Sequence, residues 1–455
     1  MLRVFNHWFS ARKFGFFVVE STAIGVGGLT GAAAGAMASA PAGHPFAIPA
    51  NVTLLASLAV AFVAVLQFSL YALDLYDLRI AGEDRPRGSR LLRGAGVAVA
   101  VIALASFALP GVLPAGALLG GALGAVTGAL VARGVMASLF AAPIRLLIVG
   151  NGQKARAVAN AIADQGDELF ELCAQVDPLM LSGEGSPKLE DVALAHRAEI
   201  VVMAPDEQRG LALAESLVRC RIRGMRVYDA AGFCERVLRR IPVAFLRATE
   251  LAYADELTVS AGRRFFKRLF DVTVAAILLV LAAPLMLLIA VAIKLDSKGP
   301  VFYRQERTGL DGRSYRLWKF RSMRTDAEKD GAVWAKQNDD RVTRVGRFIR
   351  RTRMDEIPQV FNVLNGDMSF VGPRPERPVF VQQLKAQIPY YGLREGVKPG
   401  ITGWAQIRYP YGASVEDAQN KLEFDLYYVK NGSLFLDMAI IFHTVRHVLL
   451  GRGAR

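Results

Sequence analysis

The sequence predicts a membrane protein of mixed α and α/β class, built from three parts. We expect a four-helix transmembrane bundle at residues 1–144, a Rossmann-like α/β middle domain at 145–250, and an α+β C-terminal domain at 263–455 with a re-entrant membrane helix. Two observations predict this class. Hydrophobic residues make up 53% of the 455 residues, and the N-terminal third gathers them into runs of membrane-spanning length. Near residue 145 these runs give way to short strand-like segments.

Four long apolar segments account for the N-terminal bundle. They lie at residues 14–38, 52–73, 92–109 and 112–131. Glycine and alanine are abundant in them, and small residues let membrane helices approach closely. Glu20 is the one acid inside these segments. The sequence leaves open whether Glu20 has a function or simply lies near the membrane interface.

The loops between these segments alternate in charge. Arginines fill residues 79–93, whereas residues 40–50 and 110–114 contain no lysine or arginine. Because positive loops stay in the cytoplasm, four crossings return the chain to the cytoplasmic side near Arg145.

The middle domain opens with a strand, a glycine-rich turn and a helix. The apolar segment 144–149 precedes a GxGxxA pattern that contains Gly150 and Gly152, and helical periodicity continues to residue 162. Backbone N–H groups at such a turn can bind phosphate, so these two glycines are candidate nucleotide-binding residues. Further strands are expected at residues 172–176, 200–203 and 225–228. Two alternatives stay open: a dinucleotide bound at the turn, or a scaffold that regulates or packs.

A connector at residues 251–262 leads to the fifth apolar segment. Residues 272–293 contain no charged side chain, yet basic residues flank both ends, which places both ends on the cytoplasmic side. Pro284 lies in the middle of this run and should kink the helix. We therefore expect a bent, re-entrant helix over about residues 265–295; an ordinary spanning helix is the alternative. A fifth complete crossing would place the C-terminal third outside, away from cytoplasmic nucleotides.

The remaining sequence reads as a soluble α+β domain with a basic surface. A β-hairpin is expected from segments 300–304 and 313–321, a basic amphipathic helix at 342–351, and a final apolar helix at 433–450. The formal net charge of +14 suits anionic partners such as phospholipid headgroups, nucleotides or phosphates. Nucleic acid is not expected, because no zinc finger, helix-turn-helix or RNP-type motif is present.

Two adjacent acids form the strongest candidate for chemistry. Asp355 and Glu356 follow three arginines and precede Pro358, which belongs in the first turn of a helix. The acids could act as a nucleophile and a divalent-metal ligand toward a phosphate substrate. They could instead cap the helix and pair with surface arginines. Spacing alone favours the capping interpretation.

Six sequence blocks in the C-terminal third resemble a known catalytic domain. They are KRLFD at 267–271, GPVFYRQERTG at 299–309, KFRSM at 319–323, DEIPQVFNVLNGDMSFVGPRPE at 355–376, VKPGITGWAQI at 397–407 and KLEFDLYYVKNGSLFLD at 421–437. This part resembles the bacterial polyprenyl-phosphate sugar-1-phosphate transferases, monotopic phosphoglycosyl transferases that begin exopolysaccharide and O-antigen assembly. The whole chain resembles the large members of that family, which are often homodimers in the bacterial inner membrane.

The resemblance implies a reaction and roles for individual residues. Asp355 would attack the β-phosphate of a UDP-sugar and release UMP, and a polyprenyl phosphate would then take the sugar phosphate from Asp355. Glu356 would hold Mg²⁺ or Mn²⁺. Pro373, Arg374 and Pro375 match the family's PRP motif, which is expected near the uridine and phosphates.

Five further basic residues stand inside the matched blocks, where they could line the phosphate site or meet lipid headgroups. They are Arg304, Arg307, Lys319, Arg321 and Lys398. One departure from the family is visible: its usual Ser-Pro kink is Ala283-Pro284 here, so the hydroxyl that would bond the released backbone carbonyl is missing. Two other functions compete with the transferase: a nucleotide-sugar oxidoreductase with NAD in the middle domain, and a non-catalytic assembly or regulatory subunit.

Overall fold

The computed structural model describes most of the chain outside the loops of the N-terminal third. The described residues are 2–4, 7–9, 11–39, 60, 63–67, 70, 96, 115–139, 143–164, 170–181, 185–206, 212–246, 260–325, 327, 340–409, 412 and 414–449. Two compact units divide the chain between residues 230 and 231, with most of the first eight residues assigned to the second unit. Three described helices are long and apolar enough to cross a membrane: Gly15–Ala38, Gly116–Val135 and Ala261–Asp296.

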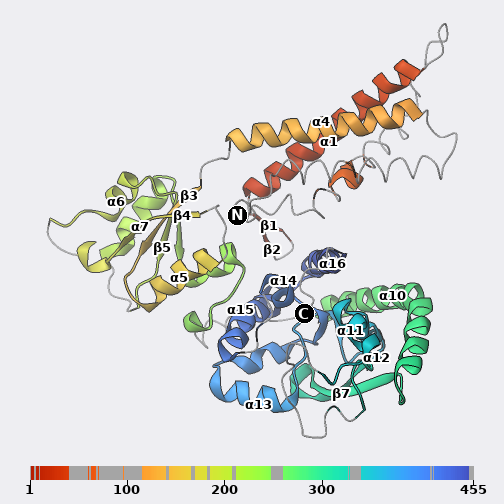
Figure 1. Cartoon of the computed structure of the whole chain (residues 1–455). Helices are drawn as coiled ribbons and strands as arrows, with labels where there is room; N and C mark the ends of the chain where they lie inside the picture. The colour runs from red at the N-terminus through yellow and green to blue at the C-terminus, as the bar shows by residue number, and fades with distance from the viewer. Residues whose placement is uncertain are drawn as a thin grey trace. The chain divides into compact units, whose positions relative to one another are not determined.

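Two long helices form the membrane part of the first unit. Helix α1 (Ala11–Ser39) and helix α4 (Ala115–Leu139) pack along each other (Figure 1). They confirm the first and fourth predicted segments, whereas the predicted segments 52–73 and 92–109 lie almost wholly outside the described residues. Glu20 of α1 is fully buried and pairs with Arg133 of α4, so its charge is balanced within the protein.

Glycines let the backbones of α1 and α4 touch. Gly27, Gly31 and Gly35 of α1 stand one helical turn apart and meet glycines of α4 in antiparallel order. A Cβ atom built on Gly31 would lie 2.1 Å from the carbonyl oxygen of Gly120. Backbone atoms cannot move aside as a flexible side chain can. A side chain at Gly31 would therefore push the two helices apart.

We expect Gly31→Leu to destabilise the membrane part. Overpacking typically costs about 1–3 kcal/mol, and here the obstacle is backbone rather than a movable side chain. The matched control is Gly15→Leu on the same helix, because a Cβ at Gly15 has no atom within 4 Å. Thermal unfolding of both variants in the same detergent checks this. Equal melting temperatures would mean that the glycine contact contributes little.

A parallel sheet forms the rest of the first unit. Strands β3 (Ile144–Val149), β4 (Phe170–Val176), β5 (Ile200–Met203) and β6 (Arg226–Asp229) are ordered β4-β3-β5-β6. The accompanying helices are α5 (Gln153–Asp164), η2 (Pro178–Leu181), α6 (Leu189–Ala195) and α7 (Ala212–Ile222). Helix α8 (Ala230–Phe233) follows β6 and begins at the boundary with the second unit. Leu147 and Val149 pack against α6 and α7, while Leu146 and Ile148 are buried on the opposite face. All four predicted strands are confirmed to within two residues.

The second unit combines a hairpin with many short helices. Two short N-terminal strands, β1 (Leu2–Val4) and β2 (His7–Phe9), pair with each other. The later elements of this unit are, in chain order, η3 (Cys234–Leu238), η4 (Val243–Phe245), α10 (Ala261–Asp296), β7 (Phe302–Thr308), η6 (Leu310–Gly312), β8 (Ser314–Phe320), α11 (Arg344–Arg351), η7 (Met354–Gln359), α12 (Val360–Asn365), β9 (Ser369–Val371), α13 (Pro378–Gln387), η8 (Tyr391–Gly396), β10 (Gly400–Thr402), α14 (Trp404–Arg408), α15 (Val415–Asn431) and α16 (Leu434–Leu449). The predicted hairpin is confirmed as antiparallel β7 and β8, although β7 continues four residues past the predicted segment 300–304. Residues 234–245, inside the range expected for the middle domain, pack within this second unit.

Helix α10 turns a corner in the middle of its length (Figure 1). A straight helix of 36 residues would be about 54 Å long. Both ends of α10 are instead tied to the same unit. Asp271, near the start, accepts from Ser369 Oγ at 3.1 Å and from the backbone of Phe370. Asp296, at the end, accepts from the backbone N–H of Val345 at 3.1 Å. The helix is therefore bent, and Pro284 inside it removes the hydrogen bond that would resist bending.

Each half of α10 has one packed face and one exposed face. Ala275 packs with Leu317 and Val363, and Ile293 packs with Phe320 and Ile349. Large apolar side chains on the other face are exposed, among them Val280, Leu281, Leu287, Leu288 and Leu295. A contiguous apolar surface of this kind marks a contact with lipid or protein.

Candidate active site

The adjacent acids lie on a short turn between two helices. After α11, Arg353 adopts a left-handed backbone conformation (φ 56°) and starts η7, the 3₁₀ turn that contains Asp355 and Glu356. Turn η7 continues directly into α12, which ends where Gly366 takes φ 93°. The local sequence thus places both acids ahead of a helix, as their position before Pro358 predicts. Asp355 is 9% exposed.

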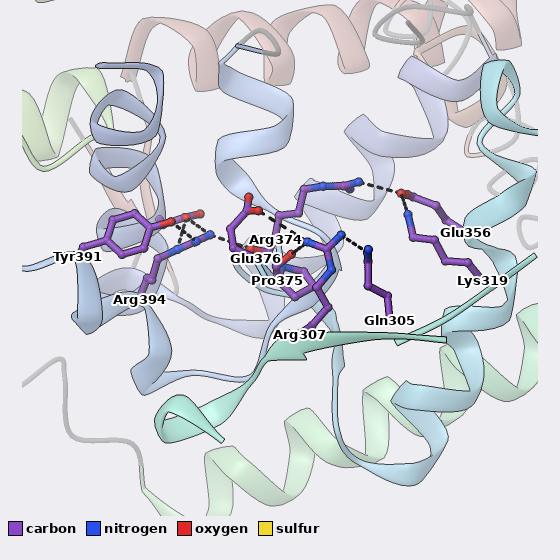
Figure 2. Close-up of polar contacts among 10 residues, drawn as sticks. Gln305, Arg307, Lys319, Glu356, Arg374, Pro375, Glu376, Tyr391 and Arg394 are labelled. Atoms are coloured by element: carbon purple, nitrogen blue, oxygen red, sulfur yellow. Dashed lines mark hydrogen bonds and ion pairs between the residues drawn. The ribbon is translucent and has the colours of Figure 1, made fainter. Parts of the chain in front are cut away.

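Two cations from other elements contact Glu356 (Figure 2). Lys319 of β8 approaches Glu356 with its Nζ 2.9 Å from Oε1, and Arg374 places Nη2 2.8 Å from the same oxygen. The contact of Lys319 Nζ to Asp355 Oδ2 is longer, at 3.9 Å. Glu356 is therefore held by two charge-assisted hydrogen bonds, whereas Asp355 has one ion pair, with Lys319 at 3.9 Å, and the charges of Arg350 and Arg374 act on it from farther away.

This environment shifts the pKa values of the two acids in opposite directions. Burial raises the pKa of Asp355, the nearby charge of Glu356 raises it further, and Lys319 opposes both. Burial would also raise the pKa of Glu356, but Arg374 and Lys319 outweigh it and hold that pKa well below the usual range. Different pKa values on paired acids are a mark of functional sites.

We expect Lys319→Met to move the acid limb of the pH–activity profile to higher pH. Lys319 favours the ionised form of both acids, so its removal raises the pKa of Asp355 still further. The carboxyl group of Asp355 then becomes fully ionised only at higher pH. The control is Arg316→Met, which removes an exposed cation from the same strand. An acid limb that stays in place in the Lys319 variant would contradict this account of the site.

The structure places the other predicted basic residues in different surroundings. Arg304 stacks on the ring of Trp318 at 3.7 Å. Arg307 donates to the carbonyl of Pro375 at 3.0 Å and so supports the PRP turn, and burial lowers its pKa. Among the described residues, neither guanidinium forms a hydrogen bond or ion pair with Asp355 or Glu356.

Two predicted residues lie elsewhere in the unit. Arg321 is 5% exposed and donates to the carbonyls of Ser297 and Lys298 at 2.8 Å, so it secures the chain after α10. Lys398 lies near the end of α12, with its Nζ 3.6 Å from a Cβ built on Gly366. These contacts give Arg321 a structural role and do not bring either residue to the acid pair.

The glycine-rich turn of the middle domain is closed by a side chain of its own unit. The carboxylate of Asp206 accepts from the backbone N–H groups of Gln153 at 2.7 Å and Lys154 at 2.9 Å. These are the donors at the start of α5 that a phosphate would use. Gly152 is required for this approach, because a Cβ there would lie 1.9 Å from the Asp206 carboxylate.

Two residues of the site region escape sequence reasoning. Arg394 lies outside every matched block, whereas Asp425 lies inside the block at 421–437 without a role assigned from the sequence. The side chain of Arg394 donates to the PRP turn and pairs with Asp425. The sequence alone does not indicate these roles, because they depend on contacts between distant segments.

The bent apolar helix and the acid pair beside two cations fit a membrane protein with a polar site in the unit that holds this helix. Comparison with known proteins gives the family. The bacterial sugar transferase model matches residues 262–451, and the chain belongs to that family. The resemblance predicted from the six blocks is confirmed.

The relatives include sugar phosphotransferases from several bacteria. The UDP-N-acetylgalactosamine-undecaprenyl-phosphate N-acetylgalactosaminephosphotransferase of Aeromonas hydrophila is 46% identical over 52% of this chain and 56% of its own length. The UDP-glucose:undecaprenyl-phosphate glucose-1-phosphate transferase of Escherichia coli is 46% identical over 43% of each chain. A protein with the same description from Caulobacter vibrioides is 44% identical over 40% of this chain and 69% of its own length. The chain thus spans about half the length of the first two relatives.

Proposed function

We propose that this protein transfers a sugar 1-phosphate from a UDP-sugar to undecaprenyl phosphate and releases UMP. One observation carries the proposal: two buried adjacent acids, Asp355 and Glu356, lie beside Lys319 and Arg374 in the unit that holds the bent helix. The descriptions of the relatives support both the donor and the lipid acceptor. The product would begin assembly of an exopolysaccharide, O-antigen or capsule.

Asp355 suits the nucleophile better than Glu356. Glu356 is held at one oxygen by two cations, whereas Asp355 has a single contact, at 3.9 Å, with Lys319. An oxygen of Asp355 would attack the β-phosphorus, and the bond to UMP would break with its electron pair leaving on UMP. An oxygen of undecaprenyl phosphate would then attack the same phosphorus and release the Asp355 carboxylate. Neither step requires a net proton transfer.

Glu356 would hold Mg²⁺ as a single carboxylate ligand. Both cations contact its Oε1, which leaves Oε2 for the ion. Among the described residues there is no group of three or more His, Cys, Asp or Glu side chains that could bind a metal without substrate. This fits Mg²⁺, which commonly binds through one or two carboxylates plus substrate phosphates. When bound, the ion would neutralise charge on the diphosphate. Arg374 would add a fixed positive charge.

The membrane arrangement follows from α10. We propose that its exposed apolar face enters the cytoplasmic leaflet of the bacterial inner membrane and that both ends return to the cytoplasm. Its bend and its two attachments to one unit support this. The acid pair would then meet the phosphate of the lipid acceptor at the headgroups. A homodimer stays a prediction.

For the middle domain we propose a Rossmann-like scaffold that holds no dinucleotide at its glycine-rich turn. The parallel order β4-β3-β5-β6 supports the layout, and Asp206 already uses the donors at the start of α5.

The identity of the released nucleotide tests the proposed function. The purified protein in lipid nanodiscs would be incubated with Mg²⁺, undecaprenyl phosphate and a panel of UDP-sugars. Repeated UMP release that requires both substrates is the expected result, with at most one UMP per enzyme molecule in the absence of undecaprenyl phosphate, and it would also name the sugar. Release of UDP would mean an ordinary glycosyl transfer and would overturn the proposal.

A further inference from the structure

The backbone of the PRP turn is held through its carbonyl groups. Proline has no N–H, so within Pro373-Arg374-Pro375 only Arg374 can donate from the backbone. Each of the three carbonyls accepts a hydrogen bond instead. The donors are Gly400 N to Pro373 at 2.9 Å, Arg394 Nη2 to Arg374 at 2.8 Å, and Arg307 Nη1 to Pro375 at 3.0 Å. The turn is therefore fixed from outside by other segments.

The donor on the central carbonyl, Arg394, is itself rigidly oriented. Asp425 of α15 accepts a hydrogen bond from its Nε at 3.0 Å and forms an ion pair with its Nη2 at 2.8 Å, and the Nη1 group donates to the hydroxyl of Tyr391 at 2.9 Å. The side chain of Arg394 is 10% exposed and that of Asp425 is 3% exposed. A planar guanidinium with this many partners has one position, and it presents an N–H to Arg374 (Figure 2).

The side chain of Arg374 extends from the same residue toward Glu356, at 2.8 Å. We propose that Arg394, oriented by Asp425 and Tyr391, is a positioning residue that holds the PRP turn so that Arg374 reaches Glu356. The effect of Arg394 on catalysis rests on the proposed function. The hydrogen bonds that orient Arg394 are present in the structure whatever the function is. Arg394 contacts neither acid in the structure and acts through the backbone of Arg374.

The decisive variant replaces the ion pair as a whole, R394M/D425L. Removal of Arg394 alone would leave a buried, unpaired Asp425 and could unfold the protein, whereas apolar replacement of a buried ion pair is often tolerated. The matched control is Lys385→Ala, which breaks the 2.8 Å bond to Glu395 beside Arg394 but has no recorded bond to the turn. We expect both proteins to melt near the wild-type temperature.

UMP release by R394M/D425L should fall about 10²-fold, the loss expected when a catalytic group is displaced by about 1 Å. The acid limb of its pH profile should also move to higher pH, because Arg374 lowers the pKa of both Glu356 and Asp355, which share their site with Lys319. A merely structural role would not shift that limb. Adding R374M to R394M/D425L should lower the rate no further than R374M alone, since both changes remove one interaction.

Amide hydrogen exchange of the peptide spanning residues 372–377 gives a readout that needs no activity. The two prolines carry no amide, so the peptide reports largely on Arg374 and its neighbours, and exchange should quicken in R394M/D425L but not in Lys385→Ala. Wild-type activity, exchange and pH profile in a folded R394M/D425L protein would overturn the positioning role while leaving the transferase intact. Altered exchange with no UMP from any wild-type reaction would support positioning and refute the proposed function.

Discussion

Asp355→Asn is expected to abolish UMP release, with a loss on the order of 10⁴-fold or more, because an amide cannot form the covalent intermediate. The substitution keeps the shape of the side chain, and Asp355 has only one long ion-pair contact, so the protein should fold. The matched control is Asp311→Asn. Asp311 is exposed in the hairpin turn at φ 54°, a conformation that asparagine tolerates.

Intact-protein mass spectrometry adds a direct test of the intermediate. With a UDP-sugar and no lipid acceptor, the wild-type protein and Asp311→Asn should gain the mass of one sugar phosphate, and Asp355→Asn should not. An adduct of the same mass on Asp355→Asn would remove this residue as the nucleophile, even if the overall transfer were confirmed.

Glu356→Gln should lower the rate about 10²- to 10³-fold, the range seen when one charge-stabilising group is removed from an active site. Lys319 and Arg374 would lose the carboxylate that holds them, and Mg²⁺ would lose its protein ligand. The pH profile should move in the opposite direction to that of Lys319→Met. Because the charge of Glu356 raises the pKa of Asp355, its removal lowers that pKa and shifts the acid limb to lower pH.

The measurement is kcat and KM for the UDP-sugar across pH and across Mg²⁺ concentration. Glu376→Gln is a suitable control, since it neutralises an acid next to the PRP turn that pairs with Arg307 at 3.7 Å. If Glu356→Gln had an unchanged Mg²⁺ requirement, Glu356 would not be the metal ligand. If its acid limb moved upward, the assignment of that limb to Asp355 would be wrong.

Local patterns predicted much of the fold because they depend on neighbouring residues. The strand at residues 144–149 matches β3, and the segments 300–304 and 313–321 pair as β7 and β8. The kink at Pro284 follows from the missing backbone donor. The sequence also singled out Asp355, Glu356 and Arg374, through their spacing and their match to the family's motifs.

The surroundings of these residues could not be predicted in the same way. Lys319 and Arg321 stand two positions apart in one block, yet one contacts Glu356 and the other secures the end of α10. A turn that reads as a phosphate site holds the carboxylate of Asp206 instead. In both cases the deciding partner lies tens of residues away.

The sequence by itself indicated a membrane protein of the bacterial sugar transferase family and the acids that are candidates for its chemistry. It also predicted the strands of the parallel sheet, the β7–β8 hairpin and the long apolar helices α1, α4 and α10. Periodicity, charge in the loops and local motifs carry that information. The tertiary structure alone determined how the pKa values of Asp355 and Glu356 differ. Their opposite pKa shifts arise because β8 brings Lys319 and the PRP turn brings Arg374 to Glu356, while Asp355 is buried and its one ion pair, with Lys319, is 3.9 Å long. It also revealed Arg394, whose role exists only where α15, η8 and the turn meet, because hydrogen bonds act over a few ångströms in space and take no account of separation along the chain.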